Sequence, residues 1–307
     1  MQGIEDSELF FKKEALPVLE HDFPELFPRI AAGMAGRGSE CFGFDDEISR
    51  DHDFTTGFAI WLEREDEIRY GFKLQRAYDE LKKRSFPAPV AESKLGPSEH
   101  GVTVIEDFYR RHTGLSGAPT CWQEWLYTPE YAFAEATNGK VFMDNSGSFS
   151  AIRNTILCDM PEDVRLKKIA ARLAVMAQSG QYNFLRMLKH GEPGSAAMAL
   201  HEFVKNAVSL IFLLNFRFAP YYKWQFRAMR TLPLFSGLEP ELAKLLTQEL
   251  PGKEKAGMVE KISSAIAEHL RETGLSSCCD AYLEPHAFDV MKKIRSARIR
   301  GLHVMEG

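Results

Sequence analysis

GSECFGFDDEISRDHDF, residues 38–54 of this 307-residue chain, joins a Gly-Ser turn to two aspartates in the pattern Asp-x-Asp. A strand places alternate side chains on one face, so we expect Asp51 and Asp53 to project side by side. Two adjacent carboxylates repel each other unless a cation lies between them, and Mg²⁺ prefers such oxygen ligands. Backbone N–H groups near Gly38 and the hydroxyl of Ser39 suit phosphate oxygens. The stretch therefore predicts a metal-dependent site for phosphoryl or nucleotidyl transfer.

Strand and helix patterns flank this stretch on both sides. Residues 29–35 predict a short buried strand that enters the turn, and residues 51–62 predict an alternating strand that leaves it. Further along, the pattern predicts a charged helix at 65–84, a loop with three prolines at 86–98, a strand at 102–105 and a helix at 106–112. Before the turn, residues 7–18 predict a helix with Ser7 as its N-cap. The N-terminal part therefore mixes strands and helices.

After about residue 115 the pattern becomes helical, with short helices around a turn at 144–147 and long helices from Pro161 onward. The longest of these covers residues 195–218 and is apolar on much of its circumference. We therefore predict an α+β chain in which a small mixed-sheet domain at 1–118 precedes an all-α bundle at 119–307. Residues 119–160 are expected to form the connecting segment.

The composition is that of an ordinary globular protein, with 45% hydrophobic and 26% charged residues. The net charge of −5 implies no general attraction to nucleic acid or to an anionic membrane. The five cysteines form no Cys-x-x-Cys pair, so they suggest neither a disulfide framework nor a zinc site, and a reducing cytoplasm fits best. The N-terminus lacks a secretory pattern, and the apolar run near 207–214 is too short to span a bilayer. We therefore expect a cytoplasmic protein without a membrane partner.

Eleven residues separate the Gly38-Ser39 pair from the Asp51-x-Asp53 pair. This combination is similar to the signature of the DNA polymerase β-like nucleotidyltransferase superfamily. The longer string resembles one uncharacterised bacterial branch, whose members carry a helical C-terminal domain of unknown function. Three later blocks also fit that branch: Val141-Phe142-Met143-Asp144, Arg217-Phe218-Ala219-Pro220-Tyr221-Tyr222-Lys223-Trp224 and Leu283-Glu284-Pro285-His286-Ala287. The resemblance therefore covers most of the chain.

The resemblance implies a mixed sheet with helices behind it and a cleft against the helical half. Gly38 and Ser39 would contact the β- and γ-phosphates of a nucleoside triphosphate, with ATP the expected one. Asp51 and Asp53 would ligate Mg²⁺ or Mn²⁺, and a third acid on a neighbouring strand would often act as base. The acceptor hydroxyl would attack the α-phosphorus and pyrophosphate would leave.

The chain departs from the superfamily pattern at several positions. Arg37 precedes the Gly-Ser pair, and His52 separates the two aspartates, where apolar residues are usual. The third acid is absent from its expected place, because the cleft-facing position of strand 102–105 is Thr103. Glu99 lies four residues earlier on the same face if the strand extends that far, and Glu106 lies on the opposite face near the strand end. Either could substitute, or the site relies on metal alone; we take Glu99 as the candidate catalytic residue.

A second candidate group, Arg217, Tyr221 and Lys223, follows the long helix. The group either completes a helix end, where cations and aromatic rings pack, or binds substrate through triphosphate oxygens and ring stacking. We assign these three residues to substrate binding.

Two functions remain open from the sequence. The first is a Mg²⁺-dependent nucleotidyltransferase that modifies a hydroxyl of an unidentified acceptor, a small molecule rather than a macromolecule. The alternative is a catalytically weak or inactive module on the same fold that binds a nucleotide or a partner. Modification of nucleic acid is a third possibility, which the acidic net charge disfavours.

Overall fold

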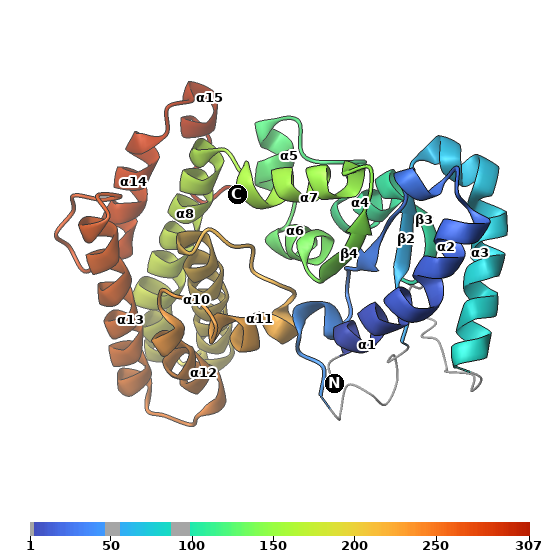
Figure 1. The fold of residues 1–307 in the computed structure, drawn as a ribbon. Coiled ribbons are helices and arrows are strands. Elements are labelled where there is room, and N and C mark those ends of the chain that lie inside the picture. Colours follow the sequence, from blue (N-terminus) through green and yellow to red (C-terminus); the bar gives the residue numbers. More distant parts are fainter. Residues whose placement is uncertain (1–2, 47–55, 87–98) are drawn as a thin grey trace. The chain divides into compact units, whose positions relative to one another are not determined.

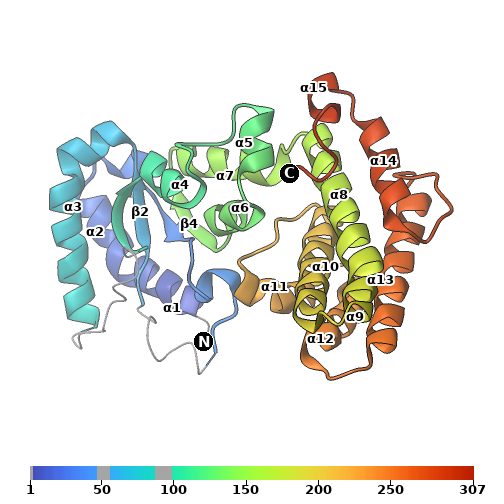
Figure 2. The ribbon, with the colours of Figure 1, turned by 180° about the vertical axis from the view of Figure 1, so that it is seen from behind.

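The computed structural model describes residues 3–46, 56–86 and 99–307. Contacts between residues divide the chain into two units (Figures 1 and 2). The first contains Met1–Thr120 and Ala132–Asp159, and the second contains Cys121–Tyr131 and Met160–Gly307. The first unit thus includes much of the segment 119–160 that we expected to be a connection, and the domain boundary between 118 and 119 stays a prediction.

A mixed sheet of four strands, in the order β3-β2-β1-β4, forms the centre of the first unit. Strand β1 (Ala31–Met34) is antiparallel to β2 (Ala59–Leu62) and to β4 (Lys140–Asp144), whereas β2 is parallel to β3 (Gly101–Val104). The expected α+β class is confirmed. Strand β4 was not expected, because its residues lie beside strong turn formers and its pairing with β1 is non-local.

Helices α1 (Gly3–Phe10), α2 (Leu16–Asp22) and α3 (Arg64–Ser85) cover one face of the sheet (Figure 1). A π-helical turn at Phe11–Ala15 joins the first two. Phe11 packs edge-on against Phe58 with ring centroids 5.2 Å apart, and the core continues to Leu74 and Tyr78 of α3. The charged helix that we predicted at 65–84 is therefore confirmed as the cover of this face.

The expected N-cap at Ser7 is wrong. Helix α1 begins at Gly3, and Ser7 is buried within it, where its hydroxyl accepts a hydrogen bond of 3.3 Å from the Gly57 N–H. Asp45 lies at the helix start instead, since its carboxylate accepts a 2.8 Å bond from the Gly3 N–H. A carboxylate at that position complements the helix dipole.

Helices α4 (Ile105–Thr113) and α7 (Ser148–Cys158) cover the other face of the sheet. Trp61 of β2 is fully buried there and stacks on Phe149 with ring centroids 3.8 Å apart. Gly114 ends α4 with φ +79°, as predicted from the sequence, because a left-handed residue favours glycine. Asp144 accepts bonds from the Gly147 and Ser150 N–H groups and so caps α7.

Helices make up the second unit, which confirms the expected helical C-terminal region (Figure 2). They are α5 (Trp122–Tyr127), α8 (Glu162–Met176), α9 (Leu185–Lys189), α10 (Pro193–Leu214), α11 (Tyr222–Met229), α12 (Glu239–Thr247), α13 (Gly252–Glu272), α14 (Leu283–Lys293) and α15 (Ala297–Arg300). A π-helical segment at Ala177–Phe184 connects α8 to α9. Helix α6 (Glu130–Thr137) contributes its first two residues to this unit and the rest to the first unit.

Helix α10 ends at Leu214, four residues earlier than expected. Asn215 donates to the Leu234 carbonyl at 3.1 Å and accepts from the Leu234 N–H at 3.0 Å, and Phe216 adopts φ +55°. These contacts turn the chain before Pro220. By length and composition alone α10 could span a membrane, and 67% of its most apolar window is buried inside the protein, as in the core helix of a globular protein.

Candidate functional site

Each of the four strands has one end beside the Gly-Ser turn, and these four ends together form one edge of the sheet. The turn follows β1, and β2 starts beside it because the two strands are antiparallel. Strand β3 is parallel to β2, so Glu99 and His100 precede it at the same edge. Met34 is opposite Lys140, which brings Asn138 and Gly139 there as well. The sheet therefore gathers segments that are far apart in the sequence around residues 36–39.

The backbone of the turn is fixed by Asn138 and Gly139. The Gly36 N–H donates to Asn138 Oδ1 at 2.9 Å, and the amide of Asn138 donates back to the Gly36 carbonyl at 2.7 Å. Gly139 has φ +67°, and a Cβ on it would lie 2.0 Å from the Met34 carbonyl oxygen. Only glycine allows this close approach of two backbones.

Gly38 and Ser39, which we predicted to contact phosphates, lead into a short 3-10 helix at Glu40–Phe42. Among the described residues, the Ser39 side chain makes no cap to that helix; its hydroxyl donates to Glu40 Oε2 at 3.4 Å. The Glu40 carboxylate also lies over Gly38, because a Cβ on Gly38 would be only 2.2 Å from Glu40 Oε1. A phosphate that approaches Gly38 must displace this carboxylate or share a cation with it.

Glu99 lies against the turn. Strand β3 begins at Gly101, so the strand does not extend to Glu99, yet the Glu99 Cδ is 3.0 Å from the position that a Cβ would take on Gly36. Gly36 has φ +130°, which also requires glycine. The other sequence candidate, Glu106, is in the first turn of α4 at the opposite end of β3 and lies 3.7 Å from Arg64. Glu106 is therefore wrong as a third carboxylate, because it is at the far edge of the sheet.

A chain of charged groups continues from Glu99 into the protein. Glu99 Oε2 lies 3.4 Å from Arg111 Nη1 and 3.5 Å from His112 Nε2. His112 Nδ1 lies 3.6 Å from Glu135 Oε2, which in turn lies 3.7 Å from Arg37 Nε. The His112 side chain is 0% exposed, so its ring is enclosed between the two carboxylates. This cluster connects Arg37, one residue before the Gly-Ser pair, to Glu99.

The neighbours of Glu99 and His112 shift their pKa values in opposite directions. Burial works against the charged forms of both groups. The pKa of Glu99 is nevertheless lowered, because His112, Arg111 and Arg37 favour the carboxylate. The pKa of His112 is raised, because Glu135 and Glu99 favour the imidazolium. Glu99 is therefore ionised at neutral pH, which suits a carboxylate that attracts a cation better than one that abstracts a proton.

Asp51 and Asp53 lie outside the described residues, and the described chain resumes at Thr56, three residues before β2. The part of the chain that the structure does describe holds no group of three His, Cys, Asp or Glu side chains suited to a metal ion. The chemistry of the expected donors, three carboxylates with Glu99 included, is the oxygen-only set that Mg²⁺ and Mn²⁺ accept.

The second candidate group belongs to the second unit, whereas Gly38, Ser39 and Glu99 belong to the first. Arg217 and Tyr221 are exposed on either side of Pro220, and α11 starts directly after Tyr221. The Tyr221 ring lies 4.5 Å from that of Tyr222, centroid to centroid, and Lys223 Nζ lies 4.9 Å from the centroid of the Trp224 ring. The group thus exposes cations and aromatic rings, and some of these side chains also contact one another.

Sequence reasoning missed Asn138, Glu135, Arg111 and His112. Each of them is far from residues 36–39 in the sequence, and no local pattern predicts that it lies beside the turn. Arg111 and His112 were interpreted only as part of a helix end, and Glu135 only as part of a short helix.

Comparison with known proteins gives limited similarity. The model of a domain of unknown function, DUF4037, matches residues 125–225, which include Arg217, Tyr221 and Lys223. No curated protein matches the chain. Among solved structures, the chain is similar to a nucleotidyltransferase-like protein from Exiguobacterium sibiricum 255-15, with 10% sequence identity and a TM-score of 0.37. That alignment covers 89% of this chain and 79% of the other. The similarity to a nucleotidyltransferase-like fold is therefore loose.

Proposed function

We propose that this protein is a Mg²⁺-dependent nucleotidyltransferase that moves a nucleoside monophosphate from a triphosphate, with ATP the expected donor, to a hydroxyl of a small-molecule acceptor in the cytoplasm. One observation carries the proposal: the Glu99 carboxylate lies against the turn that contains Gly38 and Ser39. This occurs at the sheet edge where β2 begins, shortly after Asp51 and Asp53 in the sequence. A phosphate-binding turn beside acidic side chains is the arrangement that triphosphate chemistry needs.

In this proposal Asp51 and Asp53, with Glu99, would hold Mg²⁺ or Mn²⁺, which neutralises phosphate charge when bound. The N–H groups of the turn and the Ser39 hydroxyl would orient the β- and γ-phosphates. Arg37 directly precedes Gly38, and half of its side chain is exposed. It offers a further cation to the phosphate oxygens. Glu40 would move from Gly38 as the phosphates enter.

The chemical step is an in-line displacement. An acceptor oxygen forms a bond to the α-phosphorus, the bond from that phosphorus to the bridging oxygen of the β-phosphate breaks, and pyrophosphate leaves with the electron pair. The acceptor proton passes to Glu99 or to water. Because the pKa of Glu99 is below its usual value, positioning and charge neutralisation supply most of the rate.

Arg217, Tyr221 and Lys223 of the second unit would bind substrate through their own chemistry. Arg217 and Lys223 carry the cations that phosphate oxygens prefer, and the Tyr221 ring suits stacking on an aromatic ring.

Two aspartate variants test the proposal. Asp51→Asn and Asp53→Asn should each reduce Mg²⁺-dependent pyrophosphate release by at least about 100-fold, because each removes a carboxylate ligand of the ion that neutralises the phosphate charge. The assay supplies α-labelled nucleotides, Mg²⁺ and a cell extract as the source of acceptor. Asp22→Asn, at an exposed aspartate of α2, is the matched control and should leave release unchanged. Wild-type rates in both Asp51→Asn and Asp53→Asn would contradict the proposal.

The alternative is a nucleotide-binding module without turnover. Two observations favour it: Glu40 covers Gly38, and ion pairing holds Glu99 as a weak base. Melting and label transfer, measured on the same protein, separate the two functions. Nucleotide at 100 times its dissociation constant stabilises either kind of protein by about 2.7 kcal/mol, whereas only a transferase moves label to an acceptor. Stabilisation without transfer of label supports the module, and transfer to any acceptor excludes it.

A further inference from the structure

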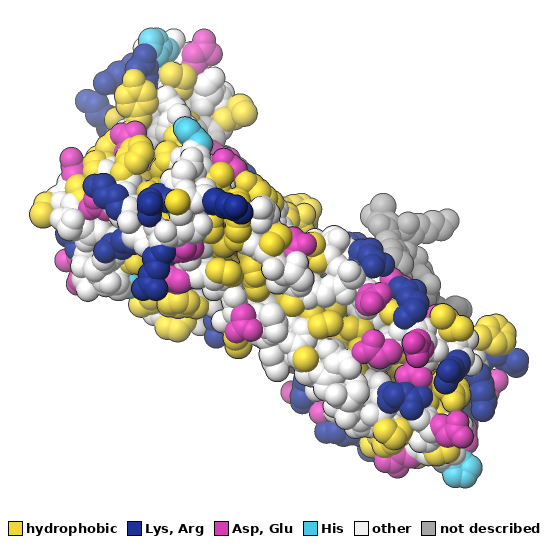
Figure 3. Space-filling view, turned by 90° about the horizontal axis from the view of Figure 1, so that it is seen from above, with side chains coloured by type: hydrophobic (Ala, Val, Ile, Leu, Met, Phe, Trp, Pro, Cys, Tyr) yellow, Lys and Arg dark blue, Asp and Glu magenta, His cyan; other side chains and the backbone are white. Residues whose placement is uncertain are grey.

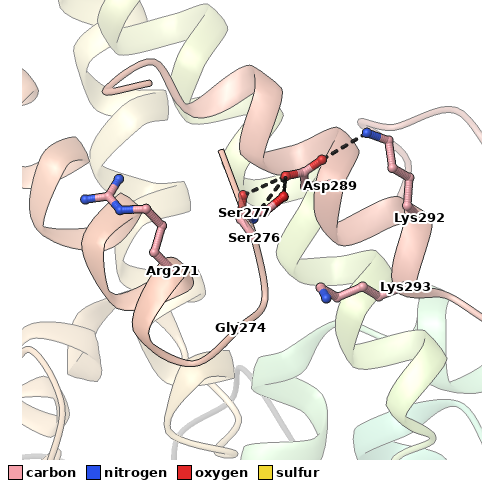
Figure 4. Close-up of a pocket in the computed structure, with 7 residues that line it drawn as sticks. All are labelled: Arg271, Gly274, Ser276, Ser277, Asp289, Lys292 and Lys293. Atoms are coloured by element: carbon pink, nitrogen blue, oxygen red, sulfur yellow. Dashed lines mark hydrogen bonds and ion pairs between the residues drawn. The ribbon is translucent and has the colours of Figure 1, made fainter. Parts of the chain in front are cut away.

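The helical unit contains a pocket of about 490 Å³ between the C-terminal end of α13 and the helix α14 (Figure 4). The loop that carries Ser276 and Ser277 lies at its centre, with Arg271 on one side and Lys292 and Lys293 on the other. This pocket lies within one unit and shares no residue with the turn at 36–39.

One anion of the protein already occupies the serine loop. Asp289 Oδ2 accepts bonds of 3.1 Å from the Ser276 hydroxyl, the Ser277 hydroxyl and the Ser277 N–H. Its other oxygen accepts from Lys292 Nζ at 2.9 Å. These donors hold the pKa of Asp289 well below its usual range. The carboxylate is therefore ionised, and its charge is matched by Lys292.

Two positive charges of the pocket remain unmatched. Arg271 and Lys293 are exposed, and among the described residues neither forms an ion pair. The charges of Asp289 and Lys292 cancel, so the pocket lining keeps a net charge of about +2 from Arg271 and Lys293. A concave wall with this charge attracts an anionic ligand.

The surrounding surface has the same sign. The nine residues 292–300 read KKIRSARIR, with five cations and no acid, in a chain whose net charge is −5. Arg295, Arg298 and Arg300 are exposed. Figure 3 shows Lys and Arg side chains (dark blue) gathered on the visible face of the helical unit. The positive charge is thus concentrated locally, although the protein as a whole is acidic.

We propose that this pocket binds the phosphate group of a ligand. A phosphate monoester carries about −1.5 to −2 charges at pH 7, which matches the two unpaired cations. Its oxygens accept charge-assisted bonds from guanidinium and ammonium donors, which Arg271 and Lys293 supply in the pocket lining. The volume falls within the range of small-molecule sites, roughly 300–1,000 Å³. The proposal does not depend on Asp51, Asp53, a metal ion or transfer of a nucleotide.

Titration of the full chain in low salt, without divalent ions, tests the proposal. Inorganic phosphate and glycerol 3-phosphate are the small probes, and binding is followed by calorimetry. Arg271→Ala combined with Lys293→Ala should weaken binding by at least about tenfold, because two charge-assisted contacts are lost. Asp289→Asn should strengthen it, because a repelling charge is removed. Lys189→Ala combined with Lys253→Ala, at exposed lysines of the same unit that do not line the pocket, is the control.

A short RNA oligonucleotide distinguishes a small phosphorylated ligand from the phosphates of a nucleic acid backbone. If the natural ligand is a small phosphorylated molecule, glycerol 3-phosphate binds, and Arg295→Ala combined with Arg298→Ala leaves its affinity unchanged. With a backbone, the oligonucleotide binds more tightly, and both pairs of substitutions weaken it and lower its salt dependence. The proposal is overturned if no probe binds, or if the variant of Arg271 and Lys293 melts like the wild type and binds with unchanged affinity.

Discussion

His112 is the residue on which the charges beside the Gly-Ser turn converge. Its ring has carboxylates at 3.5 and 3.6 Å from its two nitrogens, from Glu99 on one side and Glu135 on the other. An imidazolium between two carboxylates attracts both of them and so offsets their mutual repulsion. Replacement of His112 leaves two partly buried negative charges without the cation between them.

His112→Gln should therefore lower the free energy of unfolding, and the loss should depend on pH. The pKa of His112 is raised above 6.5 in the folded protein, so its contribution is fully present below 6.5 and is lost as pH rises through the folded value. The difference between wild type and variant should be about 1–3 kcal/mol at pH 5.5 and smaller at pH 8.5. Urea denaturation at both pH values measures it.

The exposed His21 provides the control, since His21→Gln should leave the free energy of unfolding unchanged at both pH values.

The contribution of Glu99 to stability has the opposite pH dependence. Its pKa lies below 4.5, so the contribution is present above pH 4.5 and is lost as pH falls through the lower folded value. Equal destabilisation of His112→Gln at pH 5.5 and pH 8.5 would show that the ion pairs contribute nothing.

At the scale of elements, one buried carboxylate joins the first turn of α6 to the helices α8 and α10. Glu130, at the start of α6, accepts from Lys168 and Arg172 of α8 at 3.1 Å each and from Ser209 of α10 at 2.9 Å. Burial opposes its charge, but Lys168 and Arg172 lower its pKa to about 2. The Lys168 ammonium is itself almost fully buried, so it depends on this partner.

Glu130→Gln should destabilise the protein by about 3–5 kcal/mol at pH 7, because it leaves the buried Lys168 charge without its counter-charge. The cost should shrink as pH falls from the ordinary value of 4.5 towards 2, where the wild-type carboxylate also becomes neutral. Urea titrations of both proteins measure the difference. Glu268→Gln, at an exposed position of α13, is the matched control, and a Glu130→Gln protein as stable as that control would contradict the prediction.

At the scale of the whole molecule, each unit buries its own apolar side chains. Trp61 and the residues packed around it lie in the first unit, and the largely buried α8 and α10 lie in the second. Units with separate cores can unfold separately, unless a large apolar interface couples them.

Calorimetry should therefore resolve two unfolding transitions that respond to different substitutions. Trp61→Ala removes a fully buried ring stacked on Phe149 and should cost the first unit about 3–5 kcal/mol. Glu130→Gln should lower the midpoint of the second unit alone. One transition that both substitutions shift equally would show that the units unfold together.

Periodicity along the chain was sufficient for the elements with local contacts. The charged pattern at 65–84 predicted α3, Gly114 marked the end of α4, and the apolar pattern after Pro161 predicted the helical region. Helical hydrogen bonds join residues four apart, so the relevant residues are adjacent in the sequence. The Gly-Ser turn is equally local, and it follows β1 as expected.

Contacts between distant residues required the folded chain. Strand β4 exists because it pairs with β1, and Ser7 is buried because the Gly57 N–H lies against it. Glu99 reaches the turn through the path of the chain before β3 rather than through strand alternation. His112, Glu135 and Asn138 come from separate elements, and no spacing in the sequence encodes their approach. Sequence patterns report neighbours along the chain, whereas the charges around the site are arranged by neighbours in space.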